Sequence, residues 1–398
     1  MNLSDLARNS YILRGSFARK GYMRWWHSFS GVNVQTGKAR TFFVEFFIIN
    51  PALGGSHPIL GQHPYYKKRG MKPSYVMVKA GAFPDENGED GKQLHAFYPL
   101  SSLQITGSPL VMQVGTPVSD EKSYPTEDIQ AGTCFYSENK LTGFVNVTSQ
   151  KARHRSLMTD VGYMEWDLEI SKAVSCHTGA LGGRFFRAFH LLNSYWHGEG
   201  IRSFFRGSVI LDGESYEITP ELSYGYADKH WGRSFNNPWF QFTCGKLTSQ
   251  RTEKELRHSV LALNGFCPRF LCFPLRHRLM LQLTYMGEDF EFTHCKWDVK
   301  ETDRRFIWHI LARNKNAVLK LSGSCKKEEM LHLHYENPDG QLSKLPLWAG
   351  ADGIGTLQLY RKGTGGRELL DTLKLENALC IYRNMENKAE TSRKRYKI

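Results

Sequence analysis

The sequence lacks long hydrophobic runs and regularly spaced cysteines. Its longest apolar stretch, residues 42–49, contains Glu45, whereas a membrane-spanning helix needs roughly 20 apolar residues. The eight cysteines are scattered and form no C-x-x-C motif, a distribution typical of free, mostly buried thiols in a reducing compartment. These features predict neither a transmembrane helix nor a disulfide framework.

Acidic residues are also fewer than basic ones. The 52 lysines and arginines against 39 acidic residues give a formal net charge of +13, which would suit nucleic acid or an anionic membrane. About a third of this excess lies in the last twelve residues. No helix-turn-helix, zinc-finger or single-stranded-RNA motif accompanies the charge. We therefore expect no nucleic-acid partner, and interpret the charge as a basic tail plus a solvated surface.

Long stretches with the helical period of about 3.6 residues are almost absent, whereas short runs of β-branched and aromatic residues between turn residues recur. Aromatic residues make up 13% of the chain. Neighbouring runs predict antiparallel hairpins, pairing 134–136 with 143–147, 208–211 with 214–218, 279–285 with 290–294, 306–312 with 317–321 and 355–361 with 368–375. Asp212-Gly213 suits a type I′ turn in one of them. This succession predicts an all-β fold of two antiparallel, barrel-like halves packed together.

Glycines at 179, 182, 183, 198 and 200 bracket residues 184–196, the one stretch with helical or irregular character. The boundary between the halves is therefore expected there. It divides the chain into an N-terminal β-barrel-like domain, 1–185, and a C-terminal β-barrel domain, 186–398, that carries the basic tail.

The densest run of chemically distinctive residues is 222–242, with the sequence LSYGYADKHWGRSFNNPWFQF. It resembles the signature of the tocopherol cyclase family, in which a Tyr or Ser leads to an acidic residue, Lys, any residue, Trp-Gly, a Phe, and then Trp with a nearby Gln. The matching positions are Asp228, Lys229, Trp231, Gly232, Phe235, Trp239 and Gln241. Asn236 replaces the usual Pro. The resemblance continues from residue 200 onward and is looser over 1–180.

This resemblance implies a lipocalin-like, two-barrel fold shared with carotenoid hydratases. It also implies an apolar, prenylated substrate in a cavity between the halves, and no cofactor. Tocopherol cyclases close a chromanol ring by adding a phenol oxygen across a prenyl double bond. The candidate substrate-binding residues are Tyr224, Trp231, Trp239, Gln241, Trp25, Trp26 and Trp196.

If the motif is extended, Tyr224, Tyr226, Asp228 and His230 project from one face of the strand and Lys229 and Trp231 from the other. As a catalytic row, a desolvated Asp228 would be a protonated general acid that protonates an alkene. Alternatively, an Asp228 carboxylate would orient His230, whose imidazolium would donate the proton. The same row also suits structural hydrogen bonding at a domain seam. Tyr226 completes the candidate catalytic set.

A second cluster lies near the N-terminus. Trp25 and Trp26 are adjacent, so they face opposite sides of a strand and only one can line a cavity. Glu45 sits in an apolar strand and needs a partner, which Arg24 or Arg40 would supply. The His332-x-His334 pair lacks residues to complete a metal shell, so no metal is expected.

The sequence thus favours a cofactor-independent cyclase or isomerase acting on an apolar, prenylated substrate. A hydratase or lyase on an isoprenoid alkene and a non-catalytic carrier of apolar ligands are the alternatives. No secretory signal or transit peptide is recognised at the N-terminus. We expect a cytoplasmic protein whose basic termini suit contact with an anionic membrane.

Overall fold

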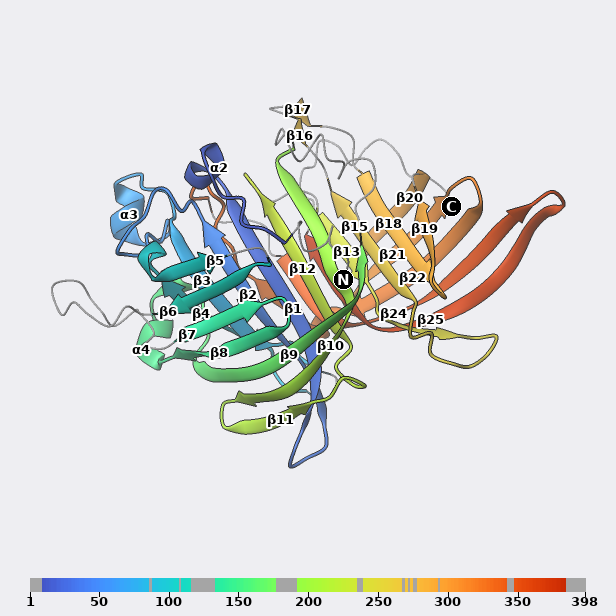
Figure 1. The fold of residues 1–398 in the computed structure, drawn as a ribbon, viewed down its shortest axis with the longest axis horizontal. Coiled ribbons are helices and arrows are strands. Elements are labelled where there is room, and N and C mark those ends of the chain that lie inside the picture. The colour runs from blue at the N-terminus through green and yellow to red at the C-terminus, as the bar shows by residue number, and fades with distance from the viewer. Residues whose placement is uncertain are drawn as a thin grey trace.

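The computed structural model describes residues 9–85, 88–106, 109–115, 133–176, 192–234, 239–266, 269–270, 273–274, 278–292, 294–341 and 347–383. Two large antiparallel sheets dominate this part of the chain, and each curves into a barrel-like half (Figure 1). The prediction of an all-β fold of two packed halves is therefore confirmed.

Within the described ranges, the first sheet has 12 strands in the order β4-β3-β2-β1-β11-β10-β9-β8-β7-β6-β5, with β12 paired to both β1 and β10. Its strands are β1 (Tyr22–Asn33), β2 (Ala39–Ile49), β3 (Tyr75–Ala82), β4 (Lys92–Tyr98), β5 (Leu103–Thr106), β6 (Val111–Gly115), β7 (Thr133–Ser137), β8 (Lys140–Val147), β9 (Gly162–Cys176), β10 (Ser194–Leu211), β11 (Glu214–Ile218) and β12 (Gly225–Gly232).

The second sheet has 11 strands in the described residues, in the order β19-β18-β15-β13-β25-β24-β22-β21-β20, with β14 on β25 and β23 on β24. They are β13 (Trp239–Thr243), β14 (Lys246–Ser249), β15 (Val260–Phe266), β18 (Arg278–Tyr285), β19 (Glu288–Phe292), β20 (His294–Glu301), β21 (Arg305–Arg313), β22 (Ala317–Lys326), β23 (Met330–Leu333), β24 (Leu347–Gly363) and β25 (Gly366–Arg383). A separate pair joins β16 (Arg269–Phe270) and β17 (Phe273–Pro274).

Helices are short in the described residues. They are α2 (Ser16–Arg19), α3 (Pro64–Lys68), α4 (Ser149–Ala152) and the 3-10 turns η1 (Leu100–Ser102), η3 (Arg155–Leu157) and η5 (Lys327–Glu329). In this part of the chain, no helix has the length and apolar character needed to cross a membrane.

The predicted hairpins form as β7–β8, β10–β11, β18–β19, β21–β22 and β24–β25. Both Asp212 and Gly213 have positive φ, 50° and 90°, as a type I′ turn requires. One strand end differs from the prediction: β19 ends at Phe292, and His294 begins β20. The local turn signals therefore set most of the hairpin registers.

The predicted boundary between the two halves is 185/186, in the Gly-rich segment. The first sheet continues beyond this position. Strands β10, β11 and β12 all belong to it, and the second sheet begins at β13. Ser194–Trp196, expected to be helical or irregular, instead start β10. Gly198 and Gly200 make room for side chains of their own strand, since a Cβ at Gly198 would lie 2.4 Å from the Ile201 side chain and a Cβ at Gly200 would lie 2.1 Å from Ser203 Oγ. Residues 184–191 of the predicted stretch, with Gly179, Gly182 and Gly183, lie outside the described residues.

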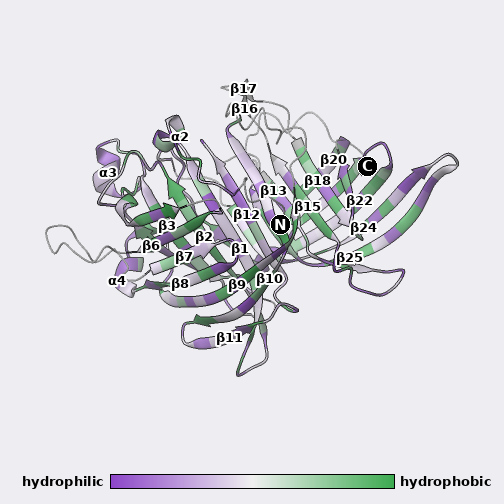
Figure 2. Ribbon diagram, viewed as in Figure 1, coloured by the Kyte–Doolittle hydropathy of each residue, from purple (hydrophilic) through white to green (hydrophobic). Residues whose placement is uncertain are grey.

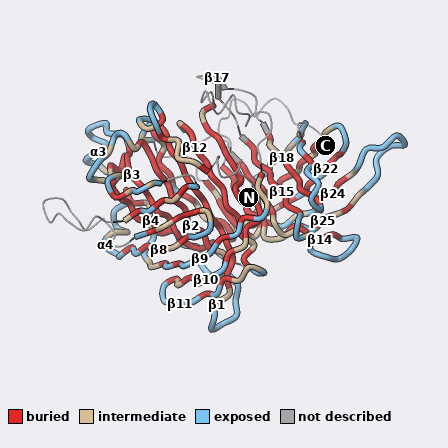
Figure 3. Tube along the Cα trace, in the orientation of Figure 1, coloured by how far each residue is buried: buried red, intermediate tan, exposed pale blue. Residues whose placement is uncertain are grey.

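Three apolar clusters fill the part of the chain that the structure describes. Figures 2 and 3 show hydrophobic, buried strand segments running through both halves. One lies inside the first sheet and includes Trp25, Phe46 and Trp166. A second fills the second sheet, around Phe242 and Trp308. The third joins residues of both sheets, such as Trp26 and Leu347. We call this third region the junction.

Candidate functional site

The motif strand β12 lies between β1 and β10. Asp228 is opposite Trp26 on one side and Gly198 on the other, and all eight residues of the strand are buried. Backbone hydrogen bonds to two neighbours fix the strand, so its side chains have little freedom to change face. The motif is therefore held rigidly at the centre of the first sheet.

Alternation along β12 separates its side chains as predicted. Tyr226 belongs to the junction cluster, and Asp228 and His230 share its parity. Trp231 belongs instead to the core of the first sheet, where it stacks on Tyr195 with ring centroids 5.4 Å apart. Tyr224 precedes the strand and has a positive φ of 39°.

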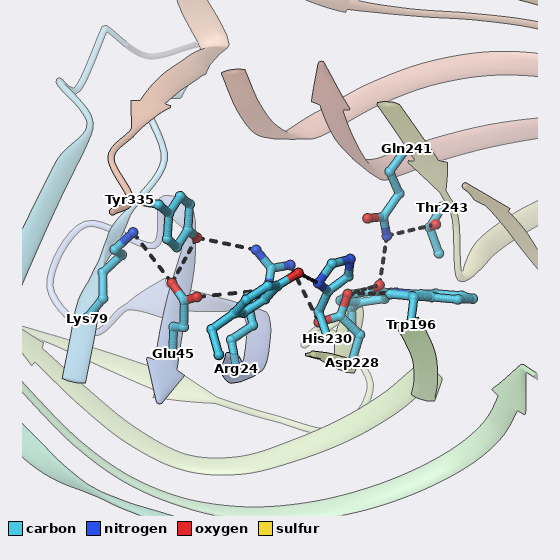
Figure 4. A network of polar contacts seen from close by, with 11 residues as sticks. Arg24, Glu45, Lys79, Trp196, Asp228, His230, Gln241, Thr243 and Tyr335 are labelled. Carbon is cyan, nitrogen blue, oxygen red and sulfur yellow. Dashed lines mark hydrogen bonds and ion pairs between the residues drawn. The ribbon is translucent and has the colours of Figure 1, made fainter. Parts of the chain in front are cut away.

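Two donors hold one oxygen of the buried Asp228 carboxyl (Figure 4). The Tyr226 hydroxyl donates to Asp228 Oδ2 at 2.7 Å, and Trp196 Nε1 donates to the same atom at 2.9 Å. The other oxygen, Oδ1, lies 3.6 Å from Arg24 Nη2. From the second sheet, Gln241 Nε2 donates to the Tyr226 hydroxyl at 2.7 Å. The carboxyl is thus oriented by both sheets.

Burial raises the pKa of Asp228 above its ordinary value, because desolvation penalises the charged form more than Arg24, Tyr226 and Trp196 stabilise it. The pKa of His230 moves the other way. Burial, together with the charges of Arg24 and Arg383, holds it well below its usual range. A neutral imidazole results, whose Nδ1 lies 2.6 Å from the Tyr22 hydroxyl. These shifts favour Asp228 over His230 as the proton donor.

A second buried carboxyl, Glu45, continues the network away from Asp228 (Figure 4). Glu45 Oε1 lies 3.8 Å from Arg24 Nε, and Oε2 lies 3.5 Å from Lys79 Nζ. The Tyr335 hydroxyl donates to Glu45 Oε2 at 2.9 Å and accepts from Arg24 Nη1 at 3.3 Å. Arg24 therefore lies between the two carboxyl groups.

Of the two partners expected for Glu45, the structure selects Arg24. Arg40 contacts Glu89 instead. Sequence reasoning missed Lys79 and Tyr335. Lys79 could have been found as the only charge in the strand 75–82, whereas Tyr335 is 290 residues from Glu45 and carries no local signal.

Burial also affects the pKa values of the two cations, Lys79 and Arg24. It lowers the pKa of Lys79 to about 8, although Glu45 opposes the shift. Burial would lower the pKa of Arg24 too, but Tyr335, Asp228 and Glu45 together raise it above its ordinary value. Arg24 therefore stays charged, while Lys79 can lose its proton near neutral pH.

The structure brings only some of the predicted binding residues together. Trp196 and Gln241 contact the Asp228 site directly, and Trp26 lies at the junction, where the Arg24 guanidinium is 5.5 Å from its ring. Trp25 and Trp231 do not line the junction, because they point from the opposite faces of β1 and β12 into the first core. Trp239 begins β13, but its side chain lies outside the described residues.

A small cavity of about 20 Å³ adjoins the site at Tyr226. Much of its lining is hydroxylated and comes from both sheets: Ser28, Ser30, Thr41, Tyr224, Tyr226 and Thr243. This volume is enough for about one water molecule. Across the described ranges, no group of three or more His, Cys, Asp or Glu residues is arranged to hold a metal ion.

Comparisons with known proteins give structural likeness only. No family model matches the chain, and no curated protein matches its sequence. The chain is similar to the crystal structure of kievitone hydratase from Nectria haematococca, with a TM-score of 0.42 and 12% identity over 91% of this chain and 89% of that one. A candidate AttH from Nitrosomonas europaea gives a TM-score of 0.38 and 12% identity over 91% and 93%. Neither activity is transferred at this distance.

Proposed function

We propose that the protein is a cofactor-independent enzyme that uses Asp228 as a general acid to protonate an alkene of an apolar, prenylated substrate at the junction. The leading reaction is ring closure, in which an oxygen of the substrate adds to the carbon that becomes cationic. The observation that carries the proposal is the buried Asp228 carboxyl, whose pKa is raised by desolvation and whose Oδ2 is oriented by Tyr226 and Trp196.

The surroundings of Asp228 suit a proton donor that must be regenerated. Once the proton leaves, the hydrogen bonds from Tyr226 and Trp196 and the charge of Arg24, 3.6 Å from Oδ1, stabilise the carboxylate. Return of a proton from the substrate oxygen then restores the acid. Gln241 keeps the Tyr226 hydroxyl directed at the carboxyl by donating to its oxygen.

The aromatic side chains of the junction suit the cationic stage of such a reaction. The rings of Trp26, Trp196 and Tyr226 belong to the same cluster, and a ring face attracts a nearby cation with about 2 kcal/mol when desolvated. The cavity at Tyr226, of about 20 Å³, is far too small for a prenyl chain. A prenylated substrate at this point requires the packing between the two sheets to open.

Hydration of the alkene is the second candidate, favoured by the hydroxyl-rich cavity next to Tyr226. A water held there by Ser28, Ser30 or Thr243 would capture the cation as an alcohol instead of a ring. The two reactions share Asp228 and differ only in which oxygen adds.

The test uses a prenylated hydroquinone in deuterated water containing ¹⁸O. Ring closure predicts solvent deuterium on carbon and no ¹⁸O in the product, whereas hydration predicts both. Asp228→Asn should abolish deuterium incorporation, since an amide cannot donate the proton. Asp167→Asn, on the exposed face of β9, serves as the matched control and should retain it. Unchanged turnover by Asp228→Asn would refute the assignment, and binding without any chemistry would favour a carrier.

A further inference from the structure

Arg383 is a buried guanidinium at the end of β25, outside the Asp228–Glu45 network. It is 4% exposed. Leu379 and Ile381 share its parity along the strand and belong to the junction cluster, whereas Cys380 and Tyr382 face the core of the second sheet. The Arg383 side chain therefore points into the junction.

Two nitrogens of Arg383 have no hydrogen-bond partner among the described residues. Within the described part of the chain, neither Nε nor Nη2 of Arg383 is satisfied. Burying a guanidinium without partners is costly. Consistent with this desolvation cost, burial lowers the pKa of Arg383 to about 10. The groups that oppose the shift are the phenols of Tyr22 and Tyr335 rather than a carboxylate.

The buried carboxyl groups nearby are engaged elsewhere. Glu45 contacts Lys79 and Arg24, and Asp228 faces Arg24. Glu336 accepts from the backbone N–H of Gly61 at 3.2 Å. The guanidinium of Arg383 is thus a buried cation at the junction, and none of these three carboxyl groups neutralises its charge.

Arg383 also lies beside the proposed site. Its charge acts on both Tyr22 and His230, whose side chains are 2.6 Å apart. His230 is two residues from Asp228 on the same face of β12. A group bound at Arg383 would therefore share the junction with the acid.

We propose that Arg383 binds a carboxylate carried by the apolar ligand of the junction. A planar guanidinium with two free donors matches a carboxylate, which accepts two parallel hydrogen bonds. The apolar walls on the same face, Leu333, Leu347 and Ile381, would cover the adjoining chain. The ligand class is then a long-chain or prenylated carboxylic acid. This inference rests on the proposed function only in placing its ligand at the same junction.

The test compares dodecanoate with dodecanol by isothermal titration calorimetry on the full chain, below the concentration at which micelles form. Hydrogen bonds between a guanidinium and a carboxylate are stronger than those to a neutral hydroxyl, so dodecanoate should bind at least about tenfold more tightly than dodecanol. Arg383→Met should remove this preference, and Arg383→Lys should keep part of it. Arg367→Met, which removes an exposed arginine of the same strand, should leave it unchanged.

A second measurement separates binding from structure. If Arg383 is an unpaired buried cation in the unliganded protein, Arg383→Met should raise the melting temperature while it removes carboxylate binding. A lower melting temperature would assign Arg383 a structural role and overturn the proposal. Equal affinity for dodecanoate and dodecanol would do the same, and tighter binding of dodecyl phosphate would overturn the carboxylate assignment. Because no turnover is measured, this outcome is independent of the Asp228→Asn test.

Discussion

The charge balance around Arg24 can be tested with Glu45→Gln. The amide still accepts the hydrogen bond from Tyr335, so the substitution removes mainly the negative charge that lies 3.8 Å from Arg24 and 3.5 Å from Lys79. Removing one partner of a fully buried ion pair typically costs 3–5 kcal/mol. Since Asp228, 3.6 Å from Arg24, can ionise as a second counter-charge once Glu45 is neutral, we expect the lower end, about 3 kcal/mol.

Urea denaturation measures this loss as a change in the free energy of unfolding. Glu288→Gln is the control, because its pair with Arg361 has a shorter distance of 2.9 Å but both side chains are more than half exposed. An exposed pair contributes about 0–1 kcal/mol. A double variant, Glu45→Gln with Lys79→Met, should recover part of the loss by removing the buried amine that has lost its carboxylate partner. If Glu45→Gln costs no more than Glu288→Gln, the argument that buried charge organises this junction fails.

The same substitution should alter the acid. Without Glu45, the whole charge of Arg24 acts on Asp228, which lowers the pKa of that carboxyl. The rate of proton transfer should then decline at a lower pH than in the unaltered protein. A pH–rate profile checks this expectation, and an unchanged alkaline limb, where the rate falls as the acid is deprotonated, would show that Glu45 and Asp228 are not coupled through Arg24.

Two further predictions concern stability. Burial raises the pKa of Glu336 from 4.5 to about 7, so between these pH values the folded state binds more protons than the unfolded state. The free energy of unfolding should therefore fall by up to about 3 kcal/mol as pH rises through this window. Urea unfolding at pH 4.5 and 7.5 should show this fall, and Glu336→Gln should abolish it. A Cβ at Gly225 would lie 2.4 Å from the Phe205 ring and 2.5 Å from the Ser203 carbonyl oxygen, so Gly225→Ala should destabilise the protein by about 2 kcal/mol. An unchanged melting temperature would contradict the close packing of β10 against β12.

The parts of the fold that local signals determine were predictable from the sequence. The turn at Asp212-Gly213 set one hairpin, and the two-residue period of β12 placed Asp228 and Trp231 on opposite sides. In the same way, Trp25 and Trp26 faced different clusters because adjacent residues of a strand must do so.

The pairing of strands that are far apart in the chain could not be predicted from the sequence. Strand β12 pairs with β1 across about two hundred residues, and nothing in its own pattern names that partner. This pairing draws β10 to β12 into the first sheet and moves the change of sheet beyond residue 232. Lys79 and Arg383 reach the junction in the same way, through strands whose neighbours local periodicity does not specify, and Tyr335 reaches it two residues after β23 ends.

The distribution of the site along the chain has a consequence for how the protein is made. Arg24 lies on the first strand, Asp228 near the middle and Arg383 at the end of β25. During synthesis, β1 must wait for β12 before its second edge is paired, and Glu45 must wait for Tyr335. Such distant contacts form slowly and leave strand edges exposed meanwhile. The early strands therefore depend on late ones, and a ribosome-bound chain that stops before residue 335 has an unfinished junction.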